Sequence, residues 1–236
     1  MTQSNDSESA VLGIMLLDTR FPRIPGDIGN ARSYSFPVRL HTVKGATVQR
    51  VIRGDRDLLK TFVDAAQELE RQGVCAITSS CGFLVDFQET VAKAVGVPVF
   101  LSSLIQIPLV HMMTQKRIGL ITGDAANLQR RDLLAAAGVP RHVPVAIAGM
   151  EEKPAYSSSV LRDGAELDRG AIEREMLEVA GELLTRNPDI GAFCLECHNF
   201  APYAAAIAKA TQRPVFDIIS FAEWVYRSQV KQVFPS

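Results

Sequence analysis

Two of the four cysteines stand at equivalent points of an internal repeat. Cys81 lies 17 positions before Pro98 (98 − 81), and Cys197 lies 17 positions before Pro214 (214 − 197). Each cysteine is followed by Ala-Lys-Ala and then by Pro-Val-Phe, so one shift of 116 residues (197 − 81) aligns both copies. Two copies of one unit predict two lobes related by a pseudo-twofold axis, with the two cysteines facing each other across a cleft.

Both cysteines follow an apolar run expected to be a strand and precede a segment expected to be helical. Open α/β sheets bind ligands at the carboxyl ends of their strands. The N–H groups and partial positive charge of a helix N-terminus favour a thiolate and lower the pKa of a thiol. A lone cysteine there is usually a small buried residue, but its repetition favours chemistry. A thiolate on one side and a thiol on the other could remove and return a proton at a carbon beside a carboxylate or carbonyl group.

The other two cysteines, Cys75 and Cys194, lie inside apolar runs without a counterpart in the other copy, so we expect them in the core. Residues 194–198 also match Cys-x-x-Cys-His, the pattern of covalent haem attachment. Residues three apart on a strand point to opposite faces, which disfavours haem, zinc and thioredoxin-like sites. No glycine-rich phosphate loop follows a strand. The sequence therefore predicts no cofactor and no metal.

Removal of such a proton leaves an enolate-like intermediate, which fixed hydrogen-bond donors must stabilise. The candidate donors and substrate contacts are Ser79, Ser80, Gly82, Thr122 and Asn199. Arg20, or another arginine in the loop up to Arg23, could hold a substrate carboxylate; the alternative is a solvated loop. His198 could be a proton partner or a loop histidine that caps the next helix. Glu196 could tune the site or be solvated.

Short apolar runs alternate with amphipathic segments, which indicates an α/β fold with mostly parallel sheets. A loop rich in Pro, Ser and Gly is expected over 153–164. The expected strands cover 11–17, 74–78, 99–101, 117–122, 143–148, 190–195 and 215–219. The expected helices cover 58–69, 84–95, 128–137, 168–186, 201–210 and 221–229.

The composition is that of a globular protein. The 236 residues are 47% hydrophobic and 22% charged, and the net charge of −1 suggests neither nucleic acid nor an anionic membrane as a partner. Residues 1–10 are polar and are expected to form a disordered tail. They carry no signal-peptide pattern, and no apolar run is long enough to span a bilayer, so we expect a cytoplasmic protein.

Several segments resemble a known enzyme family. Residues 78–83 (Thr-Ser-Ser-Cys-Gly-Phe) and 195–202 (Leu-Glu-Cys-His-Asn-Phe-Ala-Pro) resemble the two catalytic-cysteine segments of the aspartate/glutamate/hydantoin racemase superfamily. Residues 11–14 and 117–122 resemble the openings of its two lobes. The resemblance covers nearly the whole chain from about residue 11.

This resemblance implies two pseudo-symmetric, flavodoxin-like lobes with the active site between them. It places 11–115 and 215–236 in the first lobe and 116–214 in the second, and it makes Cys81 and Cys197 an acid/base pair that needs no pyridoxal phosphate or metal. Two departures put glutamate in doubt as the substrate. Asp-Thr-Arg at 18–20 stands where glutamate racemase has Asp-Ser-Gly, and His-Asn follows the second cysteine where that enzyme has Thr and then His.

The predicted function is that of a cofactor-independent racemase or epimerase acting on an amino acid or a hydantoin, a small molecule with a carboxylate or carbonyl group. The alternatives are a maleate-type cis-trans isomerase, an arylmalonate-type decarboxylase and a ligand-binding protein on the same scaffold. The decarboxylase-like relatives lack the first cysteine, so Cys81 argues against them. A homo-oligomer is a further expectation.

Overall fold

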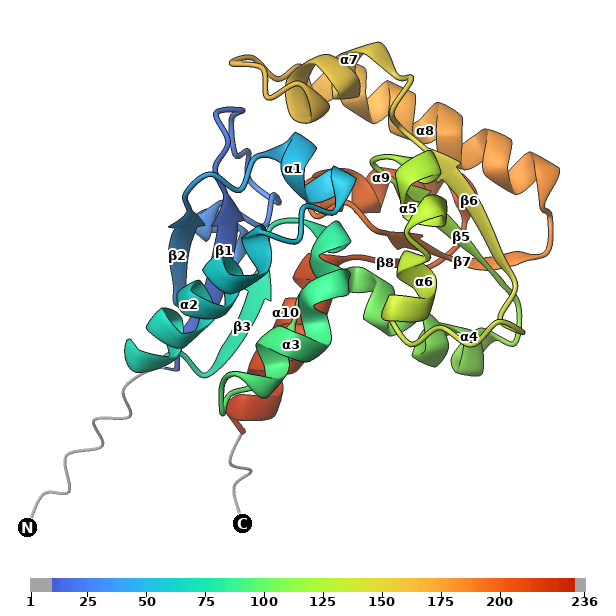
Figure 1. Ribbon diagram of the computed structural model, residues 1–236. Coiled ribbons are helices and arrows are strands. Elements are labelled where there is room, and N and C mark those ends of the chain that lie inside the picture. The colour runs from blue at the N-terminus through green and yellow to red at the C-terminus, as the bar shows by residue number, and fades with distance from the viewer. Residues whose placement is uncertain (1–9, 232–236) are drawn as a thin grey trace, which may run out of the picture.

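A computed structural model describes residues 10–231 of the chain. The expected N-terminal tail therefore lies almost wholly outside the described residues. The α/β fold with two lobes is confirmed: two four-stranded parallel sheets lie side by side with helices around them (Figure 1). The first sheet has the order β2-β1-β3-β4, with strands Val38–Val43, Leu12–Leu17, Ala76–Ser79 and Val99–Phe100. The second has the order β6-β5-β7-β8, with strands Val145–Gly149, Arg117–Thr122, Ile190–Leu195 and Val215–Phe216.

The internal repeat is visible in this topology. The two sheets share one strand order, and every strand pair in both is parallel. The 116-residue shift places β4 on β8, since 99 + 116 is 215. Each cysteine follows the third strand of its own sheet, β3 or β7. The carboxyl ends of these strands carry both thiols.

Both halves of the repeat contain short and long helices. Their bounds are α1 Val48–Arg53, α2 Leu58–Arg71, α3 Gln88–Lys93, α4 Ile107–Thr114, α5 Ala125–Arg130, α6 Leu133–Ala136, α7 Pro154–Tyr156, α8 Arg169–Arg186, α9 Ala204–Thr211 and α10 Ile218–Gln229. Five-residue and shorter turns complete them: η1 Ala31–Ser33, η3 Ser103–Gln106, η4 Ser157–Leu161 and η5 Ala201–Tyr203, while η2 is longer at Gly82–Phe87. The turn η4 is a π-helix and the other η elements are 3₁₀-helices.

Several predicted elements were wrong in detail. The helix expected over 84–95 begins as the 3₁₀-helix η2, and the one expected over 128–137 is broken at Asp132, which has a φ of 49°. The loop expected over 153–164 is mostly helical, because the Glu175 carboxylate accepts hydrogen bonds from the first N–H groups of α7. The last strand ends at Phe216, because Asp217 caps α10 through the N–H groups of the next turn. The strand β2 and the helices α1 and α4 were missed.

Two helices are exchanged between the lobes. The helix α4 follows the first sheet but packs against β5 and β7, and α10 follows the second sheet but packs against β3 of the first (Figure 1). On α10, Ile218, Phe221 and Ala222 form one buried cluster with Leu12, Ile14, Ile28, Ala76 and Phe100. The C-terminal return to the first lobe therefore begins with α10, whereas residues 215–216, expected in the first lobe, pair with β7 of the second sheet.

Arg131 of the second lobe connects that lobe to α1 and η2 of the first lobe. Its guanidinium pairs with Asp86 of η2 at 2.5 Å, and the side chains of this ion pair are 9% and 12% exposed. It also donates to the last carbonyls of α1, those of Val51 at 2.6 Å and Ile52 at 2.8 Å. A buried charge so fully paired fixes α1 and η2 relative to the second lobe.

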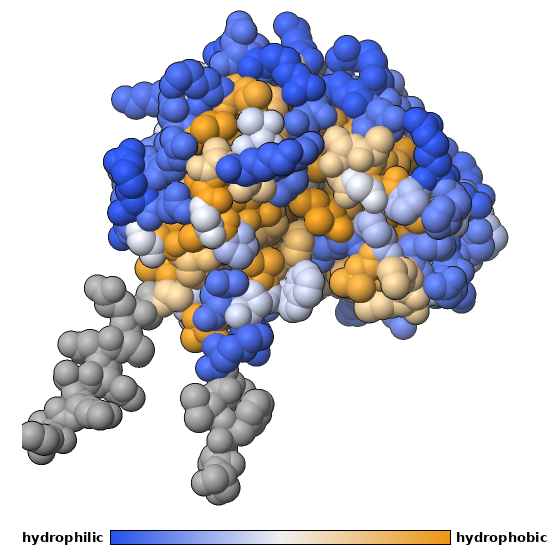
Figure 2. Space-filling view, turned by 60° about the horizontal axis from the view of Figure 1, so that its bottom comes forward, coloured by the Kyte–Doolittle hydropathy of each residue, from blue (hydrophilic) through white to orange (hydrophobic). Residues whose placement is uncertain are grey.

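The face that carries α4 and α10 is apolar. Figure 2 shows hydrophobic side chains exposed over it. A groove of about 860 Å³ runs between the two helices and is lined by Ile105, Gln106, Leu109, Val110, Phe216, Ser220, Phe221 and Trp224. Such a face fits the homo-oligomer expected from the sequence, which stays a prediction. Within residues 10–231, the helices are too short or too polar to cross a lipid bilayer.

Candidate active site

A pocket of about 370 Å³ brings the two repeated cysteines together. Both lobes contribute to its wall, which comprises Leu17, Thr19, Phe21, Arg23, Val48, Ile52, Ser80, Cys81, Phe83, Gly123, Tyr156, Val160, Leu161, Glu196, Cys197 and Asn199. Most of the wall is apolar, with a few polar groups among the apolar side chains, as in small-molecule sites. Of the residues expected at the site, it includes Cys81, Cys197, Ser80 and Asn199.

Each thiol has a backbone N–H donor two residues further along the chain. Cys81 has an extended backbone at the N-terminus of η2, and its sulfur accepts a hydrogen bond from the N–H of Phe83, two residues later. The Cys197 sulfur likewise accepts from the N–H of Asn199, two residues later. Both contacts stabilise a thiolate; Cys81 directly precedes η2, whereas Cys197 lies in a turn before η5.

Burial nevertheless outweighs these contacts. Burial, followed by the charge of Glu196, raises the pKa of Cys81 to about 12. The same two causes, in the same order, raise the pKa of Cys197 well above its ordinary value. Burial therefore outweighs the expected lowering of the thiol pKa, and both cysteines are neutral thiols near neutral pH. A thiolate needs a base or an incoming positive charge.

Tyr156 is a site residue that the sequence analysis missed. Its hydroxyl lies 3.4 Å from Cys197 Sγ, and the same sulfur lies 3.5 Å from the Asn199 side-chain oxygen. The ring is 1% exposed and packs against Phe200, with ring centroids 5.1 Å apart. Burial and the neighbouring Cys197 raise the pKa of Tyr156 well above its usual value, so its hydroxyl keeps its proton and can donate to a thiolate.

Glu196 is buried beside both cysteines rather than solvated. Its side chain is 1% exposed, and Oε2 accepts from the Thr122 hydroxyl at 2.7 Å and from the Gly123 N–H at 3.3 Å. Its Oε1 is buried and has no hydrogen-bond partner. Burial raises the pKa of this carboxyl to about 7, against the opposing effect of the Thr122 hydrogen bond. Thr122 thus contacts Glu196 and is not in the pocket wall.

Gly82 packs directly against Glu196. A side chain at this position would overlap with the carbonyl oxygen and Oε1 of Glu196, so only glycine allows the two segments to pack this closely. Gly82 is buried and lies outside the pocket wall, although it was expected to contact the substrate.

Arg23, not Arg20, lines the pocket. Its guanidinium lies 3.2 Å from Asp27 Oδ1, donates to the Thr19 hydroxyl at 2.9 Å and stacks on Phe21 at 4.3 Å from the ring centroid. The Arg20 side chain is 79% exposed and pairs with Asp163. Arg20 is therefore held away from the pocket, and its neighbour in the same loop is the arginine available for a carboxylate.

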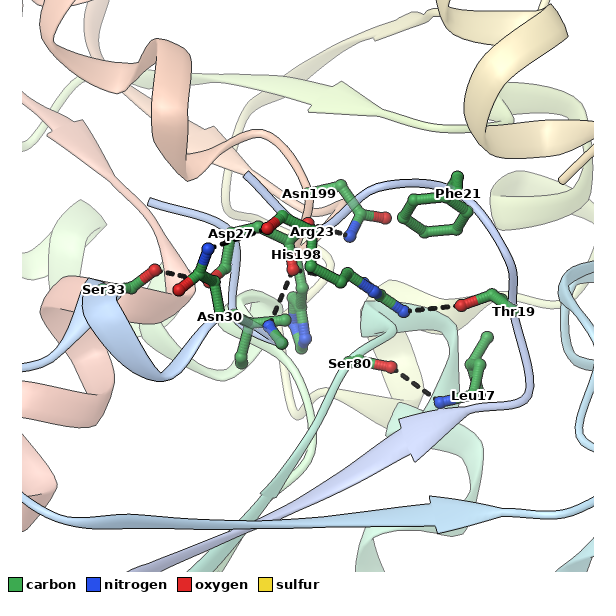
Figure 3. Close-up of polar contacts among 12 residues, drawn as sticks. Leu17, Thr19, Phe21, Arg23, Asp27, Asn30, Ser33, Ser80, His198 and Asn199 are labelled. Atoms are coloured by element: carbon green, nitrogen blue, oxygen red, sulfur yellow. Dashed lines mark hydrogen bonds and ion pairs between the residues drawn. The ribbon is translucent and has the colours of Figure 1, made fainter. Parts of the chain in front are cut away.

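Asn199 is fixed by the same cluster. Its amide nitrogen donates to Asp27 Oδ2 at 2.7 Å (Figure 3). Its side-chain oxygen lies towards Cys197. The Ser80 hydroxyl oxygen accepts from the N–H of Leu17 at 2.9 Å, so its proton is available in the pocket. The Ser79 hydroxyl instead donates to the carbonyl of Leu101, away from the pocket.

His198 is a structural residue. It is fully buried; its Nδ1 lies 2.7 Å from the Ser79 carbonyl, and its Nε2 accepts from the Ser103 N–H at 3.4 Å. Burial lowers its pKa to about 3, so the ring is neutral. The neutral ring does not support the interpretation of His198 as a proton partner. By contacting Ser79 and Ser103, it connects the loops after β3, β4 and β7.

The remaining cysteines lie apart from the pocket. Cys194 is buried in β7, and Cys75 is half-buried beside the cluster under α10. In the part of the chain that the structure describes, no three His, Cys, Asp or Glu side chains are grouped closely enough to hold a metal ion.

Solved structures with this architecture share a superfamily. Allantoin racemase from Klebsiella pneumoniae superposes with a TM-score of 0.65 at 22% identity, covering 94% of this chain and 88% of that one. Unliganded arylmalonate decarboxylase superposes with a TM-score of 0.64 at 12% identity, covering 96% and 94%. The chain has the fold of the aspartate/glutamate/hydantoin racemase superfamily. The resemblance stated from the cysteine segments is thus confirmed at the level of the fold. No family model matches the sequence.

Sequence relatives carry a different kind of name. The chain is 32% identical over 220 residues to dimethylsulfoniopropionate lyase 7 of Emiliania huxleyi (strain CCMP1516), covering 89% of this chain and 64% of the relative. It is 28% identical over 229 residues to dimethylsulfoniopropionate lyase of Durusdinium sp. clade D, covering 94% and 75%. The chain spans about three fifths of the length of the first Emiliania relatives. Of the functions predicted from the sequence, these findings fit the decarboxylase-type alternative better than the amino-acid racemase.

Proposed function

We propose that this chain is a lyase that removes a proton next to a carboxylate and expels a leaving group from the neighbouring carbon, with dimethylsulfoniopropionate as the substrate. The observation that carries the proposal is one small pocket that holds two cysteines and an arginine, in a chain similar over most of its length to dimethylsulfoniopropionate lyases. In this substrate the leaving group is dimethyl sulfide, and the other product is acrylate.

The pocket offers complementary surfaces to the two ends of this zwitterion. Arg23, with the Ser80 hydroxyl beside it in the wall, binds the carboxylate. The aromatic rings of Phe83 and Tyr156 face the sulfonium, because a soft cation is attracted to the faces of aromatic rings. The aliphatic wall from α1 and η4 excludes water, which strengthens both interactions.

Cys197 is the base in this proposal. Its thiolate would accept hydrogen bonds from the Tyr156 hydroxyl and from the Asn199 N–H, whereas no side-chain donor to Cys81 is seen among the described residues. The thiolate takes the proton from the carbon beside the carboxylate. The electron pair of that C–H bond forms the double bond of acrylate, the C–S bond breaks, and sulfur leaves with its electron pair as neutral dimethyl sulfide. Cys81 completes the opposite wall.

The test is release of dimethyl sulfide, measured by headspace gas chromatography with dimethylsulfoniopropionate as the substrate. The wild type should release it, and Cys197→Ser should lose at least about 100-fold in rate, because a serine hydroxyl is a far poorer base. Cys194→Ser is the control: it is a core cysteine outside the pocket and should retain activity. A wild-type protein that binds the substrate and releases no dimethyl sulfide would contradict the proposal.

Racemisation is the second candidate, because the repeat places two equivalent cysteines at the pocket and racemisation uses two acid/base groups. Elimination needs only one base. In this case both cysteines act, one on each face of the carbon. Solvent deuterium would enter amino acids or 5-substituted hydantoins, and Cys81→Ser and Cys197→Ser would be equally inactive. Full exchange in Cys81→Ser would exclude a two-base racemase.

A further inference from the structure

Elimination differs from racemisation in its proton balance. A racemase returns a proton to the carbon, whereas a lyase of the proposed kind releases a proton in every cycle. The base must also be made before each cycle, because burial and the charge of Glu196 keep the pKa of Cys197 well above its ordinary value. If the proposed function holds, the pocket needs a group that takes the thiol proton and later gives it to water.

Glu196 has the geometry of that group. It lines the pocket together with both cysteines and immediately precedes Cys197 in the chain. One carboxylate oxygen, Oε2, is occupied by the Thr122 hydroxyl and the Gly123 N–H, which fix the side chain. The other, Oε1, is buried without a partner. An unpaired buried oxygen is costly, so its position calls for a function.

The same carboxyl group is close to both halves of the site. Its Oε1 packs against Gly82, the residue that follows Cys81, and a side chain at Gly82 would displace it. Its negative charge is the second cause, after burial, that raises the pKa of Cys81 and of Cys197. A proton on either thiol is therefore held in place by the charge of Glu196.

We propose that Glu196 is the proton-relay residue of this pocket, with Oε1 taking the proton from the Cys197 thiol and passing it to water. When the sulfonium enters, its positive charge stabilises the thiolate, and the thiol proton moves to the carboxylate. The thiolate then takes the substrate proton, and the C–S bond breaks. As acrylate and dimethyl sulfide leave, water enters the pocket and removes the proton from Glu196. The net products are acrylate, dimethyl sulfide and one proton, so atoms and charges balance.

The pH dependence of dimethyl sulfide release tests this role. Glu196 must be ionised to accept a proton, and burial raises its pKa to about 7. The wild-type rate should therefore rise with pH around this value and then level off. In Glu196→Gln the rate at about pH 8 should fall by roughly 100-fold. It should keep rising into the alkaline range, because hydroxide must then ionise the thiol. A role in packing alone would lower the rate without changing the shape of the profile.

Glu151→Gln is the matched control. Glu151 also has a buried oxygen without a partner, and its other oxygen accepts from the N–H of Ala125 at 3.1 Å, but it is not in the pocket wall. This variant should keep the wild-type profile. Glu196→Asp keeps a carboxylate at the site, so it should keep the acidic limb at a lower rate, and it serves as the second variant if Glu196→Gln does not fold.

The outcomes separate the two proposals. Wild-type rate and profile in Glu196→Gln, with dimethyl sulfide still released, would overturn the relay and leave the lyase intact. Loss of the acidic limb in Glu196→Asp while its rate stays high would also overturn the relay. A wild type that releases no dimethyl sulfide would overturn the lyase and the relay that rests on it.

Discussion

Replacing Glu196 by glutamine should stabilise the protein at alkaline pH. Burial raises the pKa of this carboxyl from 4.5 to about 7, so the folded state binds its proton more tightly than the unfolded state. Above the folded pKa the carboxylate is charged in both states, and its burial costs about 3 kcal/mol, from about 1.4 kcal/mol per pKa unit. Below the unfolded pKa it is neutral in both states and this cost disappears. Glutamine is neutral throughout.

The free energy of unfolding, measured with urea, gives the magnitude directly. At about pH 8 the variant should exceed the wild type by roughly 3 kcal/mol, and at about pH 5 by roughly 1 kcal/mol or less. Glu166→Gln, at an exposed carboxylate, should differ from the wild type by less than about 0.5 kcal/mol at both pH values. A Glu196→Gln variant that is less stable at pH 8, or equally shifted at both values, would refute this reasoning. A gain in stability with a loss of turnover is the expected trade-off at a site that buries charge for function.

Two further substitutions probe the pocket. Tyr156→Phe removes the hydroxyl 3.4 Å from Cys197 Sγ. Loss of this hydrogen bond to a thiolate, about 1.5–3 kcal/mol, should lower kcat/KM by roughly 10- to 100-fold. It should also slow the alkylation of Cys197 by iodoacetamide, measured by peptide-resolved mass spectrometry. An unchanged alkylation rate would show that the hydroxyl does not support the thiolate. Arg23→Ala should raise KM by roughly tenfold or more. The control Arg20→Ala, at a side chain outside the pocket wall, should change KM by less than about twofold. Equal effects of the two substitutions on KM would argue against Arg23 as the carboxylate ligand.

The sequence predicted those parts of the site whose signal is local. The strands at 117–122 and 190–195 were predicted with their observed bounds, because continuous apolar runs mark buried parallel strands. The pairing of Cys81 with Cys197 followed from the repeat. Thr122 and Gly82, which were expected to contact the substrate, contact Glu196 and do not line the pocket.

The missed parts depend on contacts distant in the chain. Tyr156 lies in a segment whose Pro, Ser and Gly content predicted a loop, and it reaches Cys197 because Glu175 caps its helix from α8. Arg20 and Arg23 share one loop, and only the partner Asp163, from the other lobe, decides which one faces the pocket. For Glu196 the sequence left a tuning role and a solvated side chain open, because its burial depends on how tightly Gly82 allows the two loops to pack.

The exchange of α4 and α10 sets an order of events during synthesis. The first sheet is made early, yet the apolar side chains on one of its faces, among them Leu12 and Ile14, wait for Ile218 and Phe221 of α10. The helix α4, by contrast, is made before β5 and β7, which it covers. The first lobe therefore cannot complete its core before the second lobe has been translated. One apolar face of the first sheet therefore stays uncovered until α10 has been made, and the two lobes should fold in one cooperative step that depends on long-range contacts.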